Sequence, residues 1–420
     1  MGSLLPKLRH GLDIMPSPVA ERPGLLIRDP FRYTEEILII PPLLARGLAL
    51  FDGEQTERDL QVHLSRLSGQ IVPREITSSL IEGLKNHGFL ETEEFEMRRA
   101  QRHSEFAASP FRAPAHAGSG YPEQPTDLRK ELDAFRADPL AVLSNDNSPV
   151  TGKLLGIAAP HVSPQGGAAC YGAAYNQLSA GLSPVQEPRT IVILGTSHYG
   201  EPERFGLTRK QFSTPFGCLE VDQTLVDWLQ TRAPDAVVME DYCHAIEHSI
   251  EFQCVFLQHA LGDGFKILPI LCGPFAEATI SGTPPERDDQ VRRFLAALSE
   301  MSDCFGEHLC WVLGVDMAHV GRRYGDRMIA RSNQGEMIEV EEKDRARLNR
   351  VCAGDADGFL NLVVEERDPL KWCGFSPIYT FLKSVEGARG QVVRYDQWNI
   401  DEQSVVSFAA MSFTRGSAPV

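Results

Sequence analysis

The amino-acid sequence predicts an α/β fold for most of this chain, preceded by a smaller, mainly helical domain. From about residue 115 onward, apolar segments that can form buried strands alternate with helical segments, as is typical of a sheet flanked by helices. Two of the apolar segments, at 154–159 and 190–194, are each followed by a histidine and by turn-forming residues. The chain of 420 residues is longer than one ordinary core accommodates, so we expect two domains.

The N-terminal region is expected to be irregular over residues 1–23 and to form a small domain over 24–98. Short strands are predicted at 24–28 and 37–40. Thr56 is expected to cap a helix in which Leu60 and Leu64 lie on one stripe. The full predicted order after the strands is helix 43–51, helix 56–68, helix 75–87 and a strand at 89–91. This order resembles a winged helix, as found in the small PqqD-like peptide-binding domains.

A winged helix can bind DNA, but the charge of this segment argues against it. Residues 24–98 contain eight Lys and Arg against thirteen Asp and Glu, and the whole chain has a formal net charge of −16. Binding to nucleic acids or to anionic membranes depends on Lys and Arg that neutralise phosphate groups. We therefore expect the small domain to dock a peptide or protein, and we expect no nucleic-acid or membrane partner.

The remaining chain is expected to be a polar linker at 99–114, rich in Ala and Pro, and an α/β domain over 115–415. No apolar run approaches the roughly 20 residues that span a bilayer, and the N-terminus does not resemble a signal peptide. The nine cysteines are odd in number and scattered, without a CxxC pair. Reduced thiols in a cytoplasmic protein agree best with this pattern.

Histidines and carboxylates follow several predicted strands of the large domain. His161 and His198 follow the first two, and a third apolar strand at 309–315 leads into Asp316 and His319. Because the carboxyl ends of parallel strands share one edge of a sheet, these side chains are expected to lie together. A single strand-end histidine can equally serve as a turn cap or face solvent; two in the same setting favour a metal ligand pair.

Two further groups are candidates for the same site. The segment EHSIE opens a predicted helix and places His248 and Glu251 on one face, although carboxylates are also common at helix starts without any function. Cys373 lies at the entry of another helix, where the pKa of a thiol can be lowered, but a lone cysteine there is more often structural. Nitrogen and oxygen donors of this kind suit iron, zinc, copper or nickel rather than Mg²⁺ or Ca²⁺.

The large domain resembles the Memo-like family, component B of the AmmeMemoRadiSam gene trio. The resemblance rests on motifs that keep their order over about 300 residues: AHAGSGYP (115–122), APHVSPQGGAACYGAAY (159–175), LGTSHYG (194–200), TPFGCLEVD (214–222), EHSIE (247–251), DMAHVG (316–321), CGFSPI (373–378) and the strand 405–413. It implies a fold related to class III extradiol dioxygenases, metal ligation by His161 and His198, and radical SAM and AMMECR-like proteins as partners. The chain departs from the family at Ala318, where relatives have Cys or Ser. Because alanine cannot bind metal, we expect no His–His–Cys site and take His248 or His319 as the third ligand.

Two functions follow from these observations. The first is a metal-dependent enzyme, in which His161, His198 and His248 hold an iron, zinc or copper ion and the substrate is a small oxygenated molecule such as an aromatic diol. Its expected catalytic residues are His319, with Asp316 fixing the imidazole tautomer, and also Glu251 and Cys373. The alternative is a non-catalytic scaffold with a vestigial metal pocket, which binds a peptide or protein through its N-terminal domain.

Overall fold

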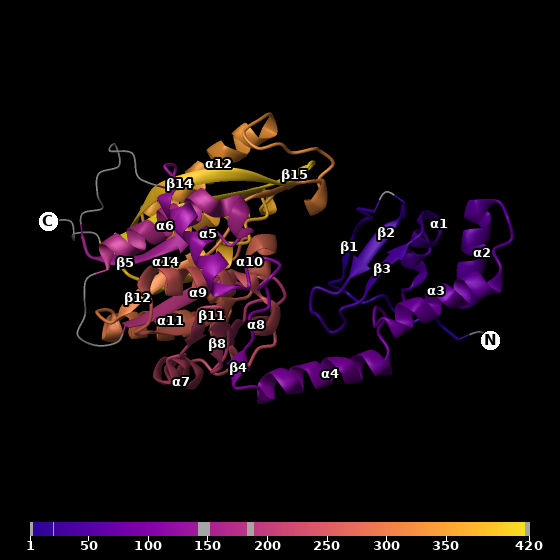
Figure 1. Ribbon diagram of the computed structural model, residues 1–420, viewed down its shortest axis with the longest axis horizontal. Helices are drawn as coiled ribbons and strands as arrows, with labels where there is room; N and C mark the ends of the chain where they lie inside the picture. The colour runs from indigo at the N-terminus through magenta and orange to yellow at the C-terminus, as the bar shows by residue number, and fades with distance from the viewer. Residues whose placement is uncertain (1–2, 20, 142–151, 183–188, 416–420) are drawn as a thin grey trace. The chain divides into compact units, whose positions relative to one another are not determined.

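The structure is a computed structural model that describes residues 3–19, 21–141, 152–182 and 189–415. The chain divides into two compact units, Met1–Ala108 and Ser109–Val420, which we describe separately (Figure 1). Among the described residues, no helix is both long and apolar enough to cross a membrane.

The first unit combines a three-stranded antiparallel sheet with a series of helices. The sheet has the order β1-β2-β3. Thr56 caps α2 as predicted, because its side chain accepts a hydrogen bond from Asp59 N while the Asp59 carboxylate accepts one from Thr56 N. The elements are β1 (Asp13–Pro16), β2 (Leu25–Arg28), β3 (Ile37–Ile40), α1 (Pro42–Ala45), the 3-10 turn Leu48–Leu50, α2 (Glu57–Ser68), α3 (Arg74–Asn86) and α4 (Glu93–Ala108).

Two expectations for this unit were wrong. The segment 1–23 is not wholly irregular, because it contributes β1 to the sheet. Most of the expected linker belongs to helix α4, whose Glu, Arg and Ala residues are good helix formers and whose Phe95 and Phe106 are buried. The strand predicted at 89–91 is a single bridge between Leu8 and Leu90, so the winged-helix assignment stays a prediction.

The second unit has the mixed α/β architecture that the sequence predicts. Its central sheet has nine strands in the order β10-β7-β11-β6-β12-β5-β15-β13, with β14 beside β15. The four middle strands β11, β6, β12 and β5 are parallel and completely or almost completely buried, which explains their continuous apolar sequences. The bounds are β5 (Leu154–Ala159), β6 (Arg189–Thr196), β7 (Phe205–Leu207), β10 (Val237–Met239), β11 (Phe265–Cys272), β12 (Leu309–Gly314), β13 (His319–Gly321), β14 (Ala388–Asp401) and β15 (Ser404–Arg415).

Helices cover both faces of this sheet, and the strand order explains how they divide. The connections from β5 to β6 and from β6 to β11 advance across the sheet in one direction, whereas the connection from β11 to β12 returns. Right-handed crossovers therefore place α6 and α9 on one face and α11 on the other, and α14 packs against α11. The helices are α5 (Pro125–Ala137), α6 (Pro164–Gly181), α7 (Gln223–Arg232), α8 (Cys243–Ile246), α9 (His248–Leu261), α10 (Ala276–Ser281), α11 (Asp289–Phe305), α12 (Glu336–Cys352), α13 (Ala356–Val364) and α14 (Phe375–Ser384).

The reversal of strand order around β12 creates a switch point in the sheet. Strand β12 lies between β5 and β6, so the chain reverses its winding around these three strands. Crevices at such switch points, beyond the carboxyl ends of the strands, are where open α/β sheets bind ligands. A small separate sheet, β4 (Phe111–Arg112), β8 (Gln211–Thr214) and β9 (Gly217–Leu219), lies outside the central one.

Candidate metal centre

Three histidines from three segments converge at the carboxyl edge of the central sheet. His161 follows β5, His198 follows β6, and His248 is the first residue of α9. One nitrogen from each ring lies within 4.8 Å of the others. The ring centroids form a nearly equilateral triangle with sides of 5.0, 5.1 and 5.0 Å. The structure thus brings together the three residues that the sequence analysis selected as metal ligands.

A buried carboxylate orients two of these rings. Glu247 caps α9, and its Oε1 lies 3.0 Å from His198 Nδ1 and 3.1 Å from His248 Nδ1. The same carboxylate accepts hydrogen bonds from the backbone N–H groups of His198 and His248, at 2.8 and 2.9 Å. Because each Nδ1 is engaged, each ring is left with Nε2 for another partner.

His161 is oriented in the same way by a backbone carbonyl. Its Nδ1 lies 2.9 Å from the carbonyl oxygen of Gly314, at the end of β12. Its side chain is only 2% exposed, whereas those of His198 and His248 are 26% and 29% exposed. The cluster therefore has one buried member and two that are partly exposed to solvent.

A thiol and a second carboxylate complete the surroundings of His161. Cys373, just before α14, places its Sγ 3.3 Å from His161 Nε2. Asp316 accepts a hydrogen bond from His161 N at 3.0 Å, and its other carboxylate oxygen lies 3.6 Å from Nε2. Ala318 is buried and offers no donor, while Cys373 brings a thiol close to His161 from another loop; the expectation that a histidine is the third ligand stays a prediction.

Histidines and acidic groups lie next to one another in the cluster, and they shift each other's pKa values. Burial by itself lowers the pKa of His161, but Asp316 and Cys373 outweigh it and raise that pKa to about 9. Burial opposes ionisation of the Cys373 thiol, yet the neighbouring histidines, His161 first, lower its pKa to about 5. The pKa of His198 is also raised, because Glu247 outweighs burial. Burial lowers the pKa of His248 to about 4 despite Glu247, and the two other histidines add to this effect.

His319, an expected catalytic residue, lies beside the cluster rather than in it. His319 Nδ1 lies 2.9 Å from the carbonyl oxygen of Met317, and its ring contacts Tyr324 edge-on at 4.9 Å between centroids. The expected pair of Asp316 and His319 is replaced by the contact of Asp316 with His161. His319 remains near enough to Cys373 for its charge to lower the thiol pKa.

Glu251 fixes a neighbouring segment instead of facing the ring nitrogens. Its carboxylate pairs with the buried guanidinium of Arg112 and accepts hydrogen bonds from His116 N and His116 Nδ1, both at 2.9 Å. Arg112 keeps the pKa of Glu251 far below its usual range even though burial opposes this. Arg112 also donates to the carbonyl oxygens of His244 and Glu247, so this network supports the start of α9.

The sequence analysis missed Glu247 and His116. Glu247 directly precedes α9 and could have been recognised as the cap of this helix, next to His248. His116 belongs to the AHAGSGYP motif, and its ring packs edge-on against His248 at 5.7 Å between centroids. Nothing in the local sequence indicates that this segment reaches α9, because the contact joins residues far apart in the chain.

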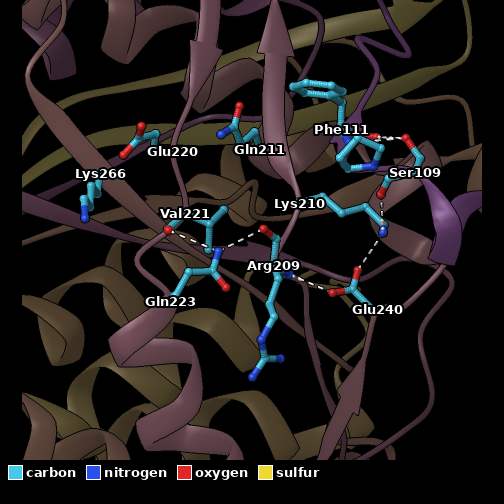
Figure 2. Close-up of a pocket in the computed structure, with 11 residues that line it drawn as sticks. Ser109, Phe111, Arg209, Lys210, Gln211, Glu220, Val221, Gln223, Glu240 and Lys266 are labelled. Atoms are coloured by element: carbon cyan, nitrogen blue, oxygen red, sulfur yellow. Dashed lines mark hydrogen bonds and ion pairs between the residues drawn. The ribbon is translucent and has the colours of Figure 1, made fainter.

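A separate cavity lies away from the histidines. Its volume is about 460 Å³. Lys210 lies 3.0 Å from Glu240 and donates to the carbonyl oxygen of Ser109 at 2.7 Å, and Figure 2 shows these residues in the cavity lining. Arg209 N donates to the same Glu240 carboxylate, and Gln223 Nε2 donates to the Arg209 carbonyl oxygen. Among its charged side chains Lys210 and Glu240 pair with each other, and Arg209 pairs with Asp227; we assign this cavity no ligand.

The donor set of the histidine cluster fits a transition-metal ion. Three imidazole nitrogens whose other ring nitrogens are held by a carboxylate or carbonyl are the usual arrangement of a histidine metal site. Such ligands, with a thiolate nearby, match zinc, iron or copper. His198 and His248 are partly exposed, so solvent reaches this side of the cluster.

Comparison with known proteins agrees with the motifs. The family model described as "Memo-like protein" matches residues 112–412. A MEMO1 family protein of Aquifex aeolicus is 26% identical over 392 residues, which cover 92% of this chain and 95% of that protein. A MEMO1 family protein of Methanopyrus kandleri is 27% identical over 317 residues, 73% of this chain and 99% of its own length.

The similarity of this chain to a solved structure is weak. The crystal structure of an uncharacterized protein from Escherichia coli K12 is 14% identical, with a TM-score of 0.34, and the match covers 57% of this chain and 90% of that one. The expected relation to class III extradiol dioxygenases therefore stays a prediction.

Proposed function

We propose that this chain, which belongs to the Memo-like protein family, binds one transition-metal ion through His161, His198 and His248. The observation that carries this proposal is the orientation of the three rings. Glu247 and the carbonyl of Gly314 engage every Nδ1, and the three rings lie at nearly equal distances from one another.

The donors favour iron, zinc or copper over Mg²⁺ and Ca²⁺, which prefer oxygen ligands. Cys373 is a fourth donor within reach, since its Sγ is 3.3 Å from His161 Nε2, and its lowered pKa makes thiolate available at neutral pH. Bound here, such an ion would supply a Lewis acid and, for iron or copper, redox chemistry toward a small oxygenated substrate.

The residues around the proposed ion have roles in substrate approach, proton transfer and ligand orientation. His198 and His248 border the accessible side of the cluster, where a substrate can approach. His319 has its Nδ1 engaged by a backbone carbonyl, which leaves its Nε2 to exchange a proton with a ligand of the proposed ion. We propose His319 as the acid/base group and Asp316 as the residue that orients His161.

Elemental analysis of protein purified without oxygen tests the metal site. We expect about one equivalent of iron, zinc or copper in the wild type and little in His198→Ala. His259→Ala is a matched control, because this histidine of the same unit bonds to Asp133 and lies on the opposite end of α9. Absence of metal from folded wild-type protein, or equal metal in wild type and His198→Ala, would contradict the proposal.

A second role is proposed for the N-terminal unit, which is compact in its own right. The Methanopyrus relative is matched over 99% of its length by only 73% of this chain, so a Memo-like protein can lack such a unit. We propose that it docks a protein partner, and the family resemblance names radical SAM and AMMECR-like proteins as candidates. Capture of either protein by the full chain but not by residues 109–420 would support this role; equal capture by both would oppose it.

A further inference from the structure

A buried carboxylate outside the histidine cluster has an unusual set of partners. Asp344, on α12, is fully buried. It accepts hydrogen bonds from Trp372 Nε1 at 2.7 Å, from Tyr395 OH at 2.8 Å and from Ser407 Oγ at 2.5 Å. All three donors are neutral, and the nearby Arg347 forms its ion pair with Asp368 instead. Burying a carboxylate among neutral groups is unfavourable, so stability alone does not explain this residue.

One of these bonds reaches the loop that carries Cys373. Trp372 immediately precedes Cys373 in the chain. Its hydrogen bond to Asp344 therefore restrains the backbone next to Cys373. The Cys373 carbonyl accepts a hydrogen bond from Thr196 Oγ1 at 2.9 Å, at the end of β6. Gly374 N then donates to the Asp316 carbonyl at 3.0 Å, so this loop meets the one that follows β12.

Another bond reaches that second loop. Ser407, on β15, donates its hydroxyl hydrogen to Asp344, and the same oxygen accepts from Ala318 N at 2.9 Å. Backbone bonds continue the contact, from Ser407 N to the Ala318 carbonyl at 3.0 Å and from Met317 N to the Ser407 carbonyl at 2.8 Å. Asp316, two residues earlier, bonds to His161.

We propose that Asp344 is a positioning residue that holds two loops, 316–319 and 372–374, in place around the histidine cluster. It acts through Trp372 on one loop and through Ser407 on the other, and it does not contact the ion itself. Its effect on a bound metal rests on the proposed function, whereas its effect on the two loops does not.

Only a carboxylate satisfies this arrangement. One oxygen accepts from the indole N–H, and the other accepts from two hydroxyls. In Asp344→Asn the amide must present its NH₂ group either to the indole N–H or to Ser407. In the first orientation two N–H donors face each other and the indole loses its acceptor. In the second, the Ser407 hydroxyl hydrogen loses its acceptor, because the Ser407 oxygen already accepts from Ala318 N.

Hydrogen exchange of individual peptides, measured by mass spectrometry, tests the effect on the loops. We expect Asp344→Asn to speed exchange about tenfold in both loops, the size expected when buried hydrogen bonds are lost. Ser407→Ala should affect mainly 316–319, and Trp372→Phe mainly 372–374. Tyr395→Phe is the matched control: it removes one bond to Asp344 but leaves both connections, so both loops should exchange as in the wild type.

Cobalt(II) serves as the probe for the metal site, because a cobalt–thiolate bond gives a charge-transfer absorption that histidine ligands do not give. We expect Asp344→Asn to bind cobalt about 10- to 100-fold more weakly, as is typical when groups behind the ligands are changed, and to lose thiolate absorption. Tyr395→Phe should keep both the affinity and the absorption of the wild type.

The outcomes separate this inference from the proposed function. Uniformly faster exchange throughout the second unit of Asp344→Asn would show a merely structural role and overturn the inference, as would unchanged exchange in both loops. Should Asp344→Asn not fold, equal effects of Ser407→Ala and Trp372→Phe on both loops would overturn it. If the wild type takes up no cobalt, the proposed function fails, while the exchange pattern still decides the role of Asp344.

Discussion

The substitution Glu247→Gln tests how far one carboxylate determines the metal centre. The Oε1 atom of Glu247 contacts His198 Nδ1 and His248 Nδ1, and its Oε2 atom accepts a hydrogen bond from His198 N. A glutamine can accept on one side only. If its oxygen takes the Oε1 position, its NH₂ opposes His198 N–H; if it is flipped, the NH₂ opposes both imidazoles. The first orientation keeps both ring contacts but leaves the His198 N–H without its acceptor, so the backbone that carries this ligand shifts; the second orientation loses both ring contacts.

The size of the effect follows from the lost bonds. Leaving a buried donor without its acceptor costs about 1–3 kcal/mol, and 1.4 kcal/mol is a factor of ten in affinity. We therefore expect Glu247→Gln to weaken metal binding about 10- to 100-fold. One effect opposes this loss: the carboxylate raises the pKa of His198, so its removal reduces competition from protons. The deficit should accordingly be larger at pH 9 than at pH 7.

Competition titration of zinc against a chelator, at both pH values, measures this deficit. Glu240→Gln is the control, because that carboxylate accepts from Thr208 and Arg209 N away from the cluster. Circular dichroism and a thermal melt establish that each variant is folded. Zinc affinity within twofold of the wild type at pH 9, in folded Glu247→Gln, would refute the argument that Glu247 orients the rings.

Three more outcomes are expected. Because the pKa of His161 is raised to about 9 and a protonated imidazole cannot bind metal, loss of this proton should raise zinc affinity by up to about tenfold per pH unit between pH 7 and 9. Titration at a series of pH values should show a smaller dependence in His161→Ala, where only the part due to His198 remains, along with loss of most of the affinity. Burial raises the pKa of Asp344 from 3.8 to about 6, although its three hydrogen-bond donors oppose this. Between these pH values the folded state therefore binds more protons than the unfolded state. The free energy of unfolding should fall by about 3 kcal/mol as the pH rises from about 4 to about 6. Urea unfolding measures this slope, and its persistence in Asp344→Asn would contradict the assignment. Arg112→Met leaves Glu251 buried without its cation, and urea unfolding should show a loss of about 3–5 kcal/mol; a loss below 1 kcal/mol would show that the pair is dispensable.

The strands and the histidines of the site could be predicted because their signals are local. The apolar segment Leu154–Ala159 is buried throughout its length, and a histidine after such a strand must lie at the carboxyl edge of the sheet. His248 was selected from its place in EHSIE, and the start of α9 does place it at the same edge. Burial and strand polarity were sufficient for these residues.

The partners of those residues could not be predicted, because they depend on tertiary contacts. Asp344 lies in a polar helical sequence that resembles a solvent-exposed face, yet it is buried against Trp372 and Ser407. Asp316 precedes His319 by three residues but bonds to His161, which comes from another strand. Helix α4 was mistaken for a linker because its composition is polar, although its two phenylalanines are buried.

The separation of the histidines along the chain would link binding of the proposed ion to folding. His161, His198 and His248 belong to three different segments and meet only when β5, β6 and α9 are assembled. An unfolded chain presents no such triad, so an ion bound as proposed would favour the native state over the denatured ensemble. At a free metal concentration 100 times its Kd, this linkage adds about 2.7 kcal/mol to the stability of the folded chain. The melting temperature of the protein should therefore report how much metal the surroundings supply.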